Sequence, residues 1–288
     1  MSDKATAAPD APAPRPGSDR AEKKAEGSFL WFLVKLVLVV LLFRTLVFTS
    51  FSIPSESMMP RLLEGDYLFA AKWPYGYSQA SLPLDVELWE GRVPEGTPER
   101  GDVVVFKHPQ DRADYIKRVI GLPGDQVQMI AGVLHINGEP VAKDRIGDLL
   151  VELRPEGRCA RARFAVRGAD GTLGCRYPRF RETLPGGRSY AVLDFGPSGA
   201  NNPYGIDADN TDAVVVPEGR LFLMGDNRDN SLDSRFPAEA GAGIGLVPVE
   251  NVVGRASFVF FSTDGTAEWL KPWTWFTAAR WQRIGGAI

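Results

Sequence analysis

The chain has 288 residues, of which 44% are hydrophobic and 24% are charged, so it can bury a full core and is not a disordered protein. Its net charge of −3 gives no reason to expect a nucleic-acid partner. It has only two histidines and two cysteines, and they show no metal-ligand spacing, so no metal site is expected.

The amino-terminal region predicts a tail followed by a membrane span. Residues 1–27 are rich in Ala and Pro and lack an apolar period, which is typical of a disordered tail. Residues 28–48, SFLWFLVKLVLVVLLFRTLVF, would extend roughly 31 Å as a helix, enough to cross a bilayer. Lys35 and Arg44 lie near its ends, where long side chains reach the polar interface. We expect a retained anchor; a cleavable signal peptide, the alternative, has a shorter apolar run.

Basic residues predict the orientation of this span. Only Arg44 and Arg61 lie near its far end, whereas five basic residues precede it: Lys4, Arg15, Arg20, Lys23 and Lys24. The positive-inside rule therefore places the amino terminus in the cytoplasm and the rest of the chain outside. In that compartment Cys159 and Cys175 are expected to form a disulfide, with two free thiols as the alternative.

The sequence after the span favours β-structure. Apolar or alternating runs bounded by Gly and Pro predict strands within residues 101–109, 133–141, 213–226 and 252–261. The pair Asn137-Gly138 predicts a two-residue hairpin turn. Residues 142–212 differ, because they are rich in Arg, Gly and Pro and hold both cysteines. We expect a β core formed by residues 49–141 and 213–288, with residues 142–212 as an inserted smaller lobe.

The carboxy-terminal region is dense in aromatic side chains: Trp269, Trp273, Trp275, Phe276 and Trp281. Tryptophan is common in protein cores, and it is also favoured at the interface of a bilayer. The sequence leaves both interpretations open.

Two serines, Ser55 and Ser57, follow the span closely, in SIPSESMMPRLLEGD, residues 52–66. A serine hydroxyl is a weak nucleophile until a base removes its proton. His108 precedes a turn and His135 lies in a hairpin, so both histidines are expected to be structural or solvent-facing rather than the base.

A lysine is the other candidate base, because burial disfavours its charged form and lowers its pKa. Lys117, in DYIKRVIGLPGD (residues 114–125), lies among apolar residues of a predicted strand. A lysine in a strand is more often a surface residue, so this spacing alone does not decide its role.

A third polar stretch, GDNRDNSLDSRF (residues 225–236), directly follows the apolar LFLM. It is no EF-hand calcium loop, because Arg228 and Ser231 occupy positions that need other residues. A dense polar cluster after a buried strand instead predicts a hydrogen-bond network that braces a site.

Together these stretches resemble the bacterial type I signal peptidases, which are membrane-anchored Ser/Lys endopeptidases. The anchor, SIPSESMMPRLLEGD, RGDVVVFKHP, YIKRVIGLPGD, MGDNRDNSLDSRF and VVGRASFVFF occur in that family's order, over about residues 28–261. The resemblance implies a mainly β fold of coiled antiparallel sheets with SH3-like barrel elements, behind one transmembrane helix. It implies neither a metal nor an organic cofactor.

The resemblance also implies roles for single residues. Ser57 is the expected nucleophile and Lys117 the general base, and the Ser55 hydroxyl and the Ser57 backbone N–H are the expected oxyanion hole. Ser231 is expected to orient the lysine. The expected supporting charges are Asp233, Arg235, Asp226 and Arg118. The residues expected near the substrate pockets are Phe51, Ile53, Pro54, Met58, Leu62, Val105, Tyr115 and Ile116.

The chain departs from the family's pattern at Glu56, where many relatives carry Gly or another small residue. A carboxylate near Lys117 would raise the pKa of the lysine and weaken the base, unless it points to solvent. There is also only one convincing span, where some relatives have two.

The function that the resemblance implies is removal of signal peptides from exported preproteins, after A-x-A-like sites. The expected location is the bacterial inner membrane, with the catalytic part in the periplasm, and the expected partners are exported preproteins and the lipid bilayer. A self-cleaving repressor-type protease is disfavoured by the anchor and by the lack of a DNA-binding module. A catalytically silent anchored β-domain that binds exported chains is the remaining alternative.

Overall fold

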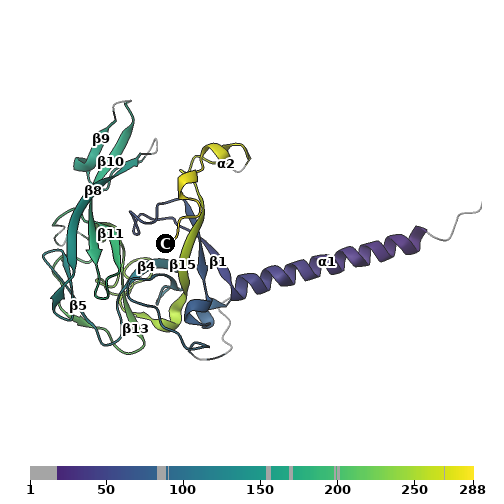
Figure 1. Ribbon diagram of the computed structural model, residues 1–288, viewed down its shortest axis with the longest axis horizontal. Helices are drawn as coiled ribbons and strands as arrows, with labels where there is room; N and C mark the ends of the chain where they lie inside the picture. Colours follow the sequence, from purple (N-terminus) through teal and green to yellow (C-terminus); the bar gives the residue numbers. More distant parts are fainter. Residues whose placement is uncertain are drawn as a thin grey trace, which may run out of the picture. The chain divides into compact units, whose positions relative to one another are not determined.

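The computed structural model describes residues 18–82, 89, 91–153, 157–168, 171–197, 199, 202–268 and 270–288, with only the backbone for residues 18–28. The chain divides into two compact units, Met1–Arg44 and Thr45–Ile288 (Figure 1).

A single long helix, α1 (Ser18–Leu46), occupies the amino-terminal part of the described chain (Figure 1). Its stretch Phe29–Leu46 is long and apolar enough to cross a membrane, and none of this stretch is buried inside the protein. The helix begins at Ser18, within the expected disordered tail, because residues 19–26 are mostly Ala, Glu, Lys and Arg, which are good helix formers. It ends before residue 48, because Phe48 pairs in a strand.

The unit Thr45–Ile288 is built on a seven-stranded antiparallel sheet. Its strand order is β1-β2-β15-β3-β4-β13-β14, so strands distant in sequence lie side by side. The strands are β1 (Phe48–Ser52), β2 (Asp66–Ala71), β15 (Val252–Ser262), β3 (Val103–Lys107), β4 (Asp114–Gly121), β13 (Arg220–Met224) and β14 (Val247–Pro248).

Two four-stranded sheets complete the strand architecture of this unit. One contains β8 (Ala142–Glu152), β9 (Ala165–Arg167), β10 (Leu173–Thr183) and β11 (Ser189–Leu193). The other contains β5 (Gln126–Ile130), β6 (Val133–Ile136), β7 (Glu139–Pro140) and β12 (Val214–Val215). The expectation of a mainly β protein of antiparallel sheets with one apolar helix is confirmed.

Short helical turns connect the strands. They are η1 (Trp73–Tyr75), η2 (Gln79–Ser81), η4 (Ala162–Phe164), η5 (Arg228–Asn230), η6 (Val249–Asn251), α2 (Thr274–Thr277) and η7 (Trp281–Arg283). Between β6 and β7, Asn137 and Gly138 both have positive φ angles, 55° and 83°. The predicted two-residue hairpin turn is confirmed, since such a turn needs residues that tolerate this conformation.

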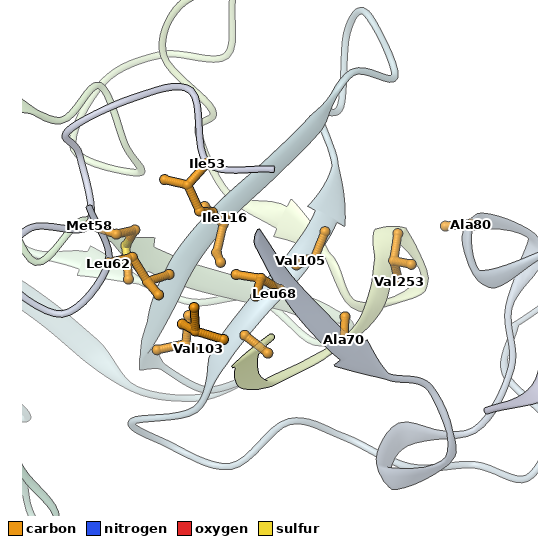
Figure 2. Packing of buried hydrophobic residues seen from close by; sticks show 12 residues of the cluster. Ile53, Met58, Leu62, Leu68, Ala70, Ala80, Val103, Val105, Ile116 and Val253 are labelled. Atoms are coloured by element: carbon orange, nitrogen blue, oxygen red, sulfur yellow. The ribbon is translucent and has the colours of Figure 1, made fainter. Parts of the chain in front are cut away.

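A hydrophobic cluster fixes the serine-bearing loop to the large sheet (Figure 2). Ile53, Met58 and Leu62 point from this loop toward apolar side chains of β2, β3, β4 and β15. Met58 and Leu62 are completely buried. Burying each such side chain contributes about 1.5–3 kcal/mol, so the loop is held on both sides of Ser57.

Cys159 and Cys175 form a disulfide, with their Cα atoms 5.6 Å apart. Cys175 is buried in a cluster with Met59, Tyr177 and other apolar residues, next to the serine-bearing loop. The bond therefore connects the segment before β9 to β10.

The aromatic carboxy-terminal region is largely exposed. Trp273, Phe276 and Trp281 are exposed by 64%, 68% and 57%, so these side chains do not form a core. Trp269 lies outside the described residues.

The disulfide provides a test of the fold. Replacing both Cys159 and Cys175 with Ser should reduce the free energy of unfolding by about 3 kcal/mol, because a cross-link over 16 residues restricts the unfolded chain. Urea unfolding of the full chain in detergent, followed by tryptophan fluorescence, measures the change. A decrease of less than about 0.5 kcal/mol would contradict this role for the disulfide.

Candidate active site

The site begins with a contact between a serine and a lysine. Ser57 lies in the loop after β1, and Lys117 lies on β4, opposite Val104 of β3. The Lys117 Nζ and Ser57 Oγ atoms are 2.7 Å apart, and both side chains are buried. The Ser55 Oγ atom lies 3.3 Å from the Ser57 Oγ atom, so three polar groups meet at one point.

Burial lowers the pKa of Lys117 to about 8, from an ordinary value of 10.5. The negative charges of Asp233 and Asp226 oppose this change, and the positive charge of Arg235 reinforces it. A large fraction of the amine is therefore neutral near pH 8, as a general base requires.

Asp233 and Arg235 form a buried ion pair behind the lysine. Arg235 donates from Nε to Asp233 Oδ1 at 2.8 Å and from Nη2 to Oδ2 at 2.9 Å, and Gly225 N–H donates to Oδ2 at 3.1 Å. Burial alone would raise the pKa of Asp233, but Arg235 and the Gly225 N–H outweigh it and hold the pKa below its usual value. Asp233 therefore remains a carboxylate.

A second buried pair joins Arg118 to Asp226, which lies two residues after the end of the neighbouring strand β13. Arg118 donates from Nε and Nη2 to the two carboxylate oxygens at 2.7 and 2.6 Å. Its Nη1 also donates to the Gly101 carbonyl at 2.7 Å, and its guanidinium lies 4.1 Å from the centre of the Tyr190 ring. Adjacent residues of a strand point to opposite faces of the sheet, so the side chains of Lys117 and Arg118 lie on opposite faces of β4.

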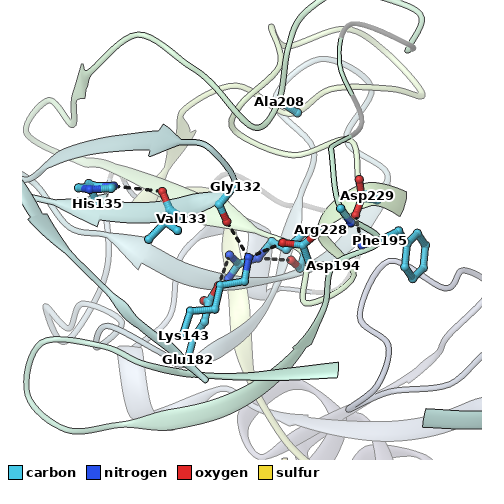
Figure 3. A network of polar contacts seen from close by, with 12 residues as sticks. Gly132, Val133, His135, Lys143, Glu182, Asp194, Phe195, Ala208, Arg228 and Asp229 are labelled. Atoms are coloured by element: carbon cyan, nitrogen blue, oxygen red, sulfur yellow. Dashed lines mark hydrogen bonds and ion pairs between the residues drawn. The ribbon is translucent and has the colours of Figure 1, made fainter. Parts of the chain in front are cut away.

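A third pair, Arg228–Glu182, connects this region to β10 and was not predicted from the sequence (Figure 3). Arg228 Nη1 donates to Glu182 Oε1 at 2.6 Å, and the Tyr190 hydroxyl donates to Oε2 at 2.9 Å. Nearby, the Phe195 N–H donates to Asp229, the residue that follows Arg228 (Figure 3). The polar stretch 225–236 is thus held by hydrogen bonds to several other elements.

Ser231, expected to orient Lys117, lies at the same site but forms no hydrogen bond with the Lys117 amine. Its Oγ atom is buried and has no hydrogen-bond partner among the described residues. Together with Ser57 and Lys117 it lines the cleft described below.

Gly225 and Asn227 are functional candidates that sequence reasoning missed. A Cβ atom at Gly225 would lie 2.3 Å from the Ser231 Oγ atom and 2.5 Å from the Ser57 carbonyl oxygen, so only glycine fits there. The Asn227 N–H donates to that same carbonyl at 3.0 Å, and its Nδ2 donates to the Glu56 carbonyl at 3.2 Å. Only the sequence GDN, directly after an apolar strand, could have indicated them.

The Ser57–Lys117 pair lies in a cleft of about 670 Å³. Six of the eight predicted pocket residues line it: Phe51, Ile53, Pro54, Val105, Tyr115 and Ile116. Met58 and Leu62 do not line it, because they are buried in the core beneath. Phe236, the last residue of the polar stretch 225–236, also lines it, and further lining comes from segments that the sequence did not indicate, among them Asn202, Pro203, Ala208, Gly241 and Ala242.

The carboxylate of Glu56, the departure noted in the sequence, accepts a hydrogen bond from Asn230 Nδ2 at 3.0 Å. The carboxylates that raise the pKa of Lys117 most are instead Asp233 and Asp226.

The ring nitrogens of the two histidines contact backbone carbonyl oxygens rather than the Ser57 hydroxyl. His108 is buried, and its Nε2 atom lies 3.1 Å from the Gly243 carbonyl oxygen. His135 Nδ1 lies 3.1 Å from the Val133 carbonyl oxygen (Figure 3). Among the described residues, no three His, Cys, Asp or Glu side chains are grouped so that they could hold a metal ion.

A serine in contact with a buried lysine of lowered pKa, in a largely apolar cleft of a β protein, is the arrangement expected of a hydrolase that uses a serine nucleophile and a lysine base. The family model described as "Signal peptidase, peptidase S26" matches residues 27–261. The chain therefore belongs to the signal peptidase family, peptidase S26, which confirms the resemblance seen in the sequence.

Curated relatives match along most of their length. The signal peptidase I of Rickettsia prowazekii (strain Madrid E) is 38% identical over 272 residues, which cover 89% of this chain and 90% of that protein. The signal peptidase I of Rickettsia massiliae (strain Mtu5) is 37% identical over 275 residues, with the same coverage. A solved signal peptidase I from Enterococcus faecalis V583 is 25% identical and covers 56% of this chain and 97% of its own, at a TM-score of 0.28.

Gly225 provides a test of the site's geometry. Gly225→Ala should lower kcat on the order of a hundredfold, because the added Cβ displaces Ser231 or the Ser57 backbone by a fraction of an ångström or more. Peptide-cleavage kinetics of the purified full chain measure the effect. Gly147→Ala is the matched control, since the nearest atom to its Cβ would be 4.0 Å away. Equal activity of the two variants would contradict the close packing at Gly225.

Proposed function

We propose that the chain is a membrane-anchored serine endopeptidase that removes N-terminal signal peptides from exported preproteins, after A-x-A-like sites. Its family and its relatives support the reaction. The observation that carries the mechanism is the 2.7 Å separation of the Ser57 Oγ and Lys117 Nζ atoms.

In the first step, neutral Lys117 accepts the hydroxyl proton of Ser57 while the Ser57 Oγ attacks the scissile carbonyl carbon. The carbonyl oxygen becomes an oxyanion, which accepts hydrogen bonds from the Ser57 backbone N–H and the Ser55 hydroxyl. Loss of one such donor typically lowers kcat by about 10²–10³. The bond from Asn227 Nδ2 to the Glu56 carbonyl supports this role, since that carbonyl belongs to the same peptide group as the Ser57 N–H.

In the second step, the Lys117 ammonium gives its proton to the scissile nitrogen, and the C–N bond breaks. The mature protein leaves with a free amine, and the signal peptide remains as an ester on Ser57. A water molecule, deprotonated by Lys117, then attacks the ester carbonyl carbon. The bond from this carbon to Ser57 Oγ breaks, the proton returns from Lys117 to Ser57 Oγ, and the signal peptide leaves with a new carboxyl group. While Lys117 is an ammonium it has three N–H donors, and the Ser231 Oγ, which has no hydrogen-bond partner among the described residues, is a suitable acceptor for one of them.

Specificity is assigned to the apolar cleft wall formed by Phe51, Ile53, Pro54, Val105, Tyr115 and Ile116. Such a wall favours small apolar side chains near the scissile bond. Met58 and Leu62 act from beneath, because they pack in one cluster with Ile53, Val105 and Ile116 (Figure 2).

The proposed location is the bacterial inner membrane, with α1 as the span and the amino terminus in the cytoplasm. The excess of basic residues before the span and the Cys159–Cys175 disulfide both support a catalytic unit in the periplasm. Within that unit we assign residues 49–141 and 213–288 to the catalytic core and residues 142–212 to an inserted lobe; the separate sheet of β8–β11 supports this division. The exposed aromatic side chains near the carboxy terminus are candidates for lipid contact.

Cleavage of a preprotein tests the proposed function. Full-length wild type in lipid should cut a preprotein with an A-x-A site after the last small residue, and Ser57→Ala and Lys117→Met should each lose at least about a thousandfold in rate. Mass spectrometry of the products gives the cut site, and quenched-flow kinetics give the rates.

Matched controls are Ser257→Ala and Lys271→Met, which remove the same groups away from the cleft and should cut at the wild-type rate. Normal cleavage by Lys117→Met would show that the base is elsewhere. A folded wild type that binds the preprotein but never cuts it would favour a silent binding protein instead.

A further inference from the structure

A second hollow of about 530 Å³ shares no lining residue with the catalytic cleft. We call it the arginine hollow, because five arginines line it: Arg61, Arg118, Arg179, Arg188 and Arg255. Asp102 is the one acidic side chain among its lining residues. The hollow is therefore strongly positive although the whole chain has a net charge of −3.

Two of the five arginines have carboxylate partners. Arg118 is paired with Asp226, and Arg188 contacts Asp102 at 2.5 Å and Glu99 at 3.1 Å. These pairs hold the two guanidinium groups in place at the wall of the hollow. Their charges are compensated, so they contribute mainly fixed N–H donors.

The other three arginines have no carboxylate partner among the described residues. Arg61 donates to the Ala287 carbonyl, and Arg179 Nε donates to the Gly147 carbonyl at 2.9 Å. The Arg255 side chain is exposed, and its guanidinium group has no hydrogen bond or ion pair with another described residue; only its backbone is hydrogen-bonded. Three uncompensated positive charges thus face one concave surface.

Crowding of like charges is evident at Arg61. Partial burial lowers its pKa most, and the positive charges of Arg118 and Arg283 lower it further, against the opposing charge of Asp226. An anion in the hollow would relieve this repulsion.

We propose that the arginine hollow binds a phosphate group. Guanidinium groups present paired N–H donors whose geometry matches two phosphate oxygens, and such charge-assisted bonds are stronger than neutral ones. The hollow is larger than a phosphate ion, so it has room for a phosphate ester with its substituent. Both inorganic phosphate and the headgroup phosphate of a phospholipid supply this chemistry.

The strand register places the hollow near the point where the chain leaves α1. Arg255 of β15 pairs with Ala71 of β2, which pairs with Phe48 of β1. At about 4.8 Å between strands, the Arg255 and Phe48 backbones are roughly 10 Å apart. Phe48 follows the end of α1, Leu46, by two residues. If α1 spans the bilayer, as proposed above, lipid headgroups lie within reach of the hollow.

Calorimetry on the full-length chain in neutral detergent tests the inference. One arm titrates inorganic phosphate, and the other titrates dihexanoyl phosphatidylglycerol, both at constant ionic strength. At least one probe should bind to wild type, and the double variant Arg61→Gln/Arg255→Gln should weaken its Kd by about tenfold or more. The tighter probe identifies the source of the phosphate group, lipid or free ion.

Arg176→Gln is the matched control, because Arg176 is exposed and lies outside the hollow; its Kd should stay within about twofold of wild type. Arg255→Gln alone removes no described contact, so it gives a result even if the double variant fails to fold. No binding of either probe to wild type overturns the inference, and so does an equal loss in Arg176→Gln. Because no preprotein is present, the result is independent of the proposed cleavage reaction.

Discussion

The catalytic site depends on keeping the Lys117 amine buried and uncharged beside the Ser57 hydroxyl. Desolvation is the largest influence on its pKa, and it acts through the apolar surroundings of β4. Two nearby carboxylates act in the opposite direction, so they would restore the positive charge if they were uncompensated. Each of them is instead held by an arginine, Asp233 by Arg235 and Asp226 by Arg118. Because the two arginines compensate these carboxylates, the carboxylates can lie close to Lys117 while its pKa stays lowered.

The backbone of the unit Thr45–Ile288 brings together the three segments that carry the residues of the site. The proposed nucleophile comes from the loop after β1, the proposed base from β4, and the residues that hold them from the segment after β13. Ile53, Met58 and Leu62 fix the first of these segments to the sheet, and Gly225 allows the third to approach it closely. The Arg228–Glu182 pair extends the bracing to β10, so the elements between β7 and β12 also support the active site.

Much of the site could be predicted because its chemistry is concentrated in short sequence stretches. Ser57, Lys117, Asp233 and Arg235 were expected from the resemblance of these stretches to the signal peptidase family, and the structure brings them together. Gly225 could not be found in this way, because its requirement arises from two atoms of other segments, the Ser231 hydroxyl and the Ser57 carbonyl. Glu182 was missed for a similar reason, since the register of β10 against its neighbours cannot be read from an arginine-rich stretch.

Apolar residues near the nucleophile show another limit of sequence reasoning. Met58 and Leu62 were predicted to lie near the pockets together with Ile53, and hydrophobicity alone does not say which of the three faces the cleft. The loop geometry decides this, because Met58 and Leu62 turn into the core while Ile53 also reaches the cleft. At the amino terminus, composition predicted a disordered tail, and local helix propensity extends α1 back to Ser18 instead.

Lys117 can act as the base because its pKa is lowered to about 8, which leaves a large fraction of the amine neutral near that pH, and direct titration of the amine tests this most directly. NMR of the full chain with ¹³C-labelled lysine follows the Cε signal with pH, and Lys117→Met assigns it among the nine lysines. The account predicts a midpoint of about 8, with catalysis present above this pH and lost about tenfold per unit below it, as the amine becomes protonated. A midpoint near the ordinary value of about 10.4 would contradict the account, because Lys117 would then be charged when Ser57 must be deprotonated.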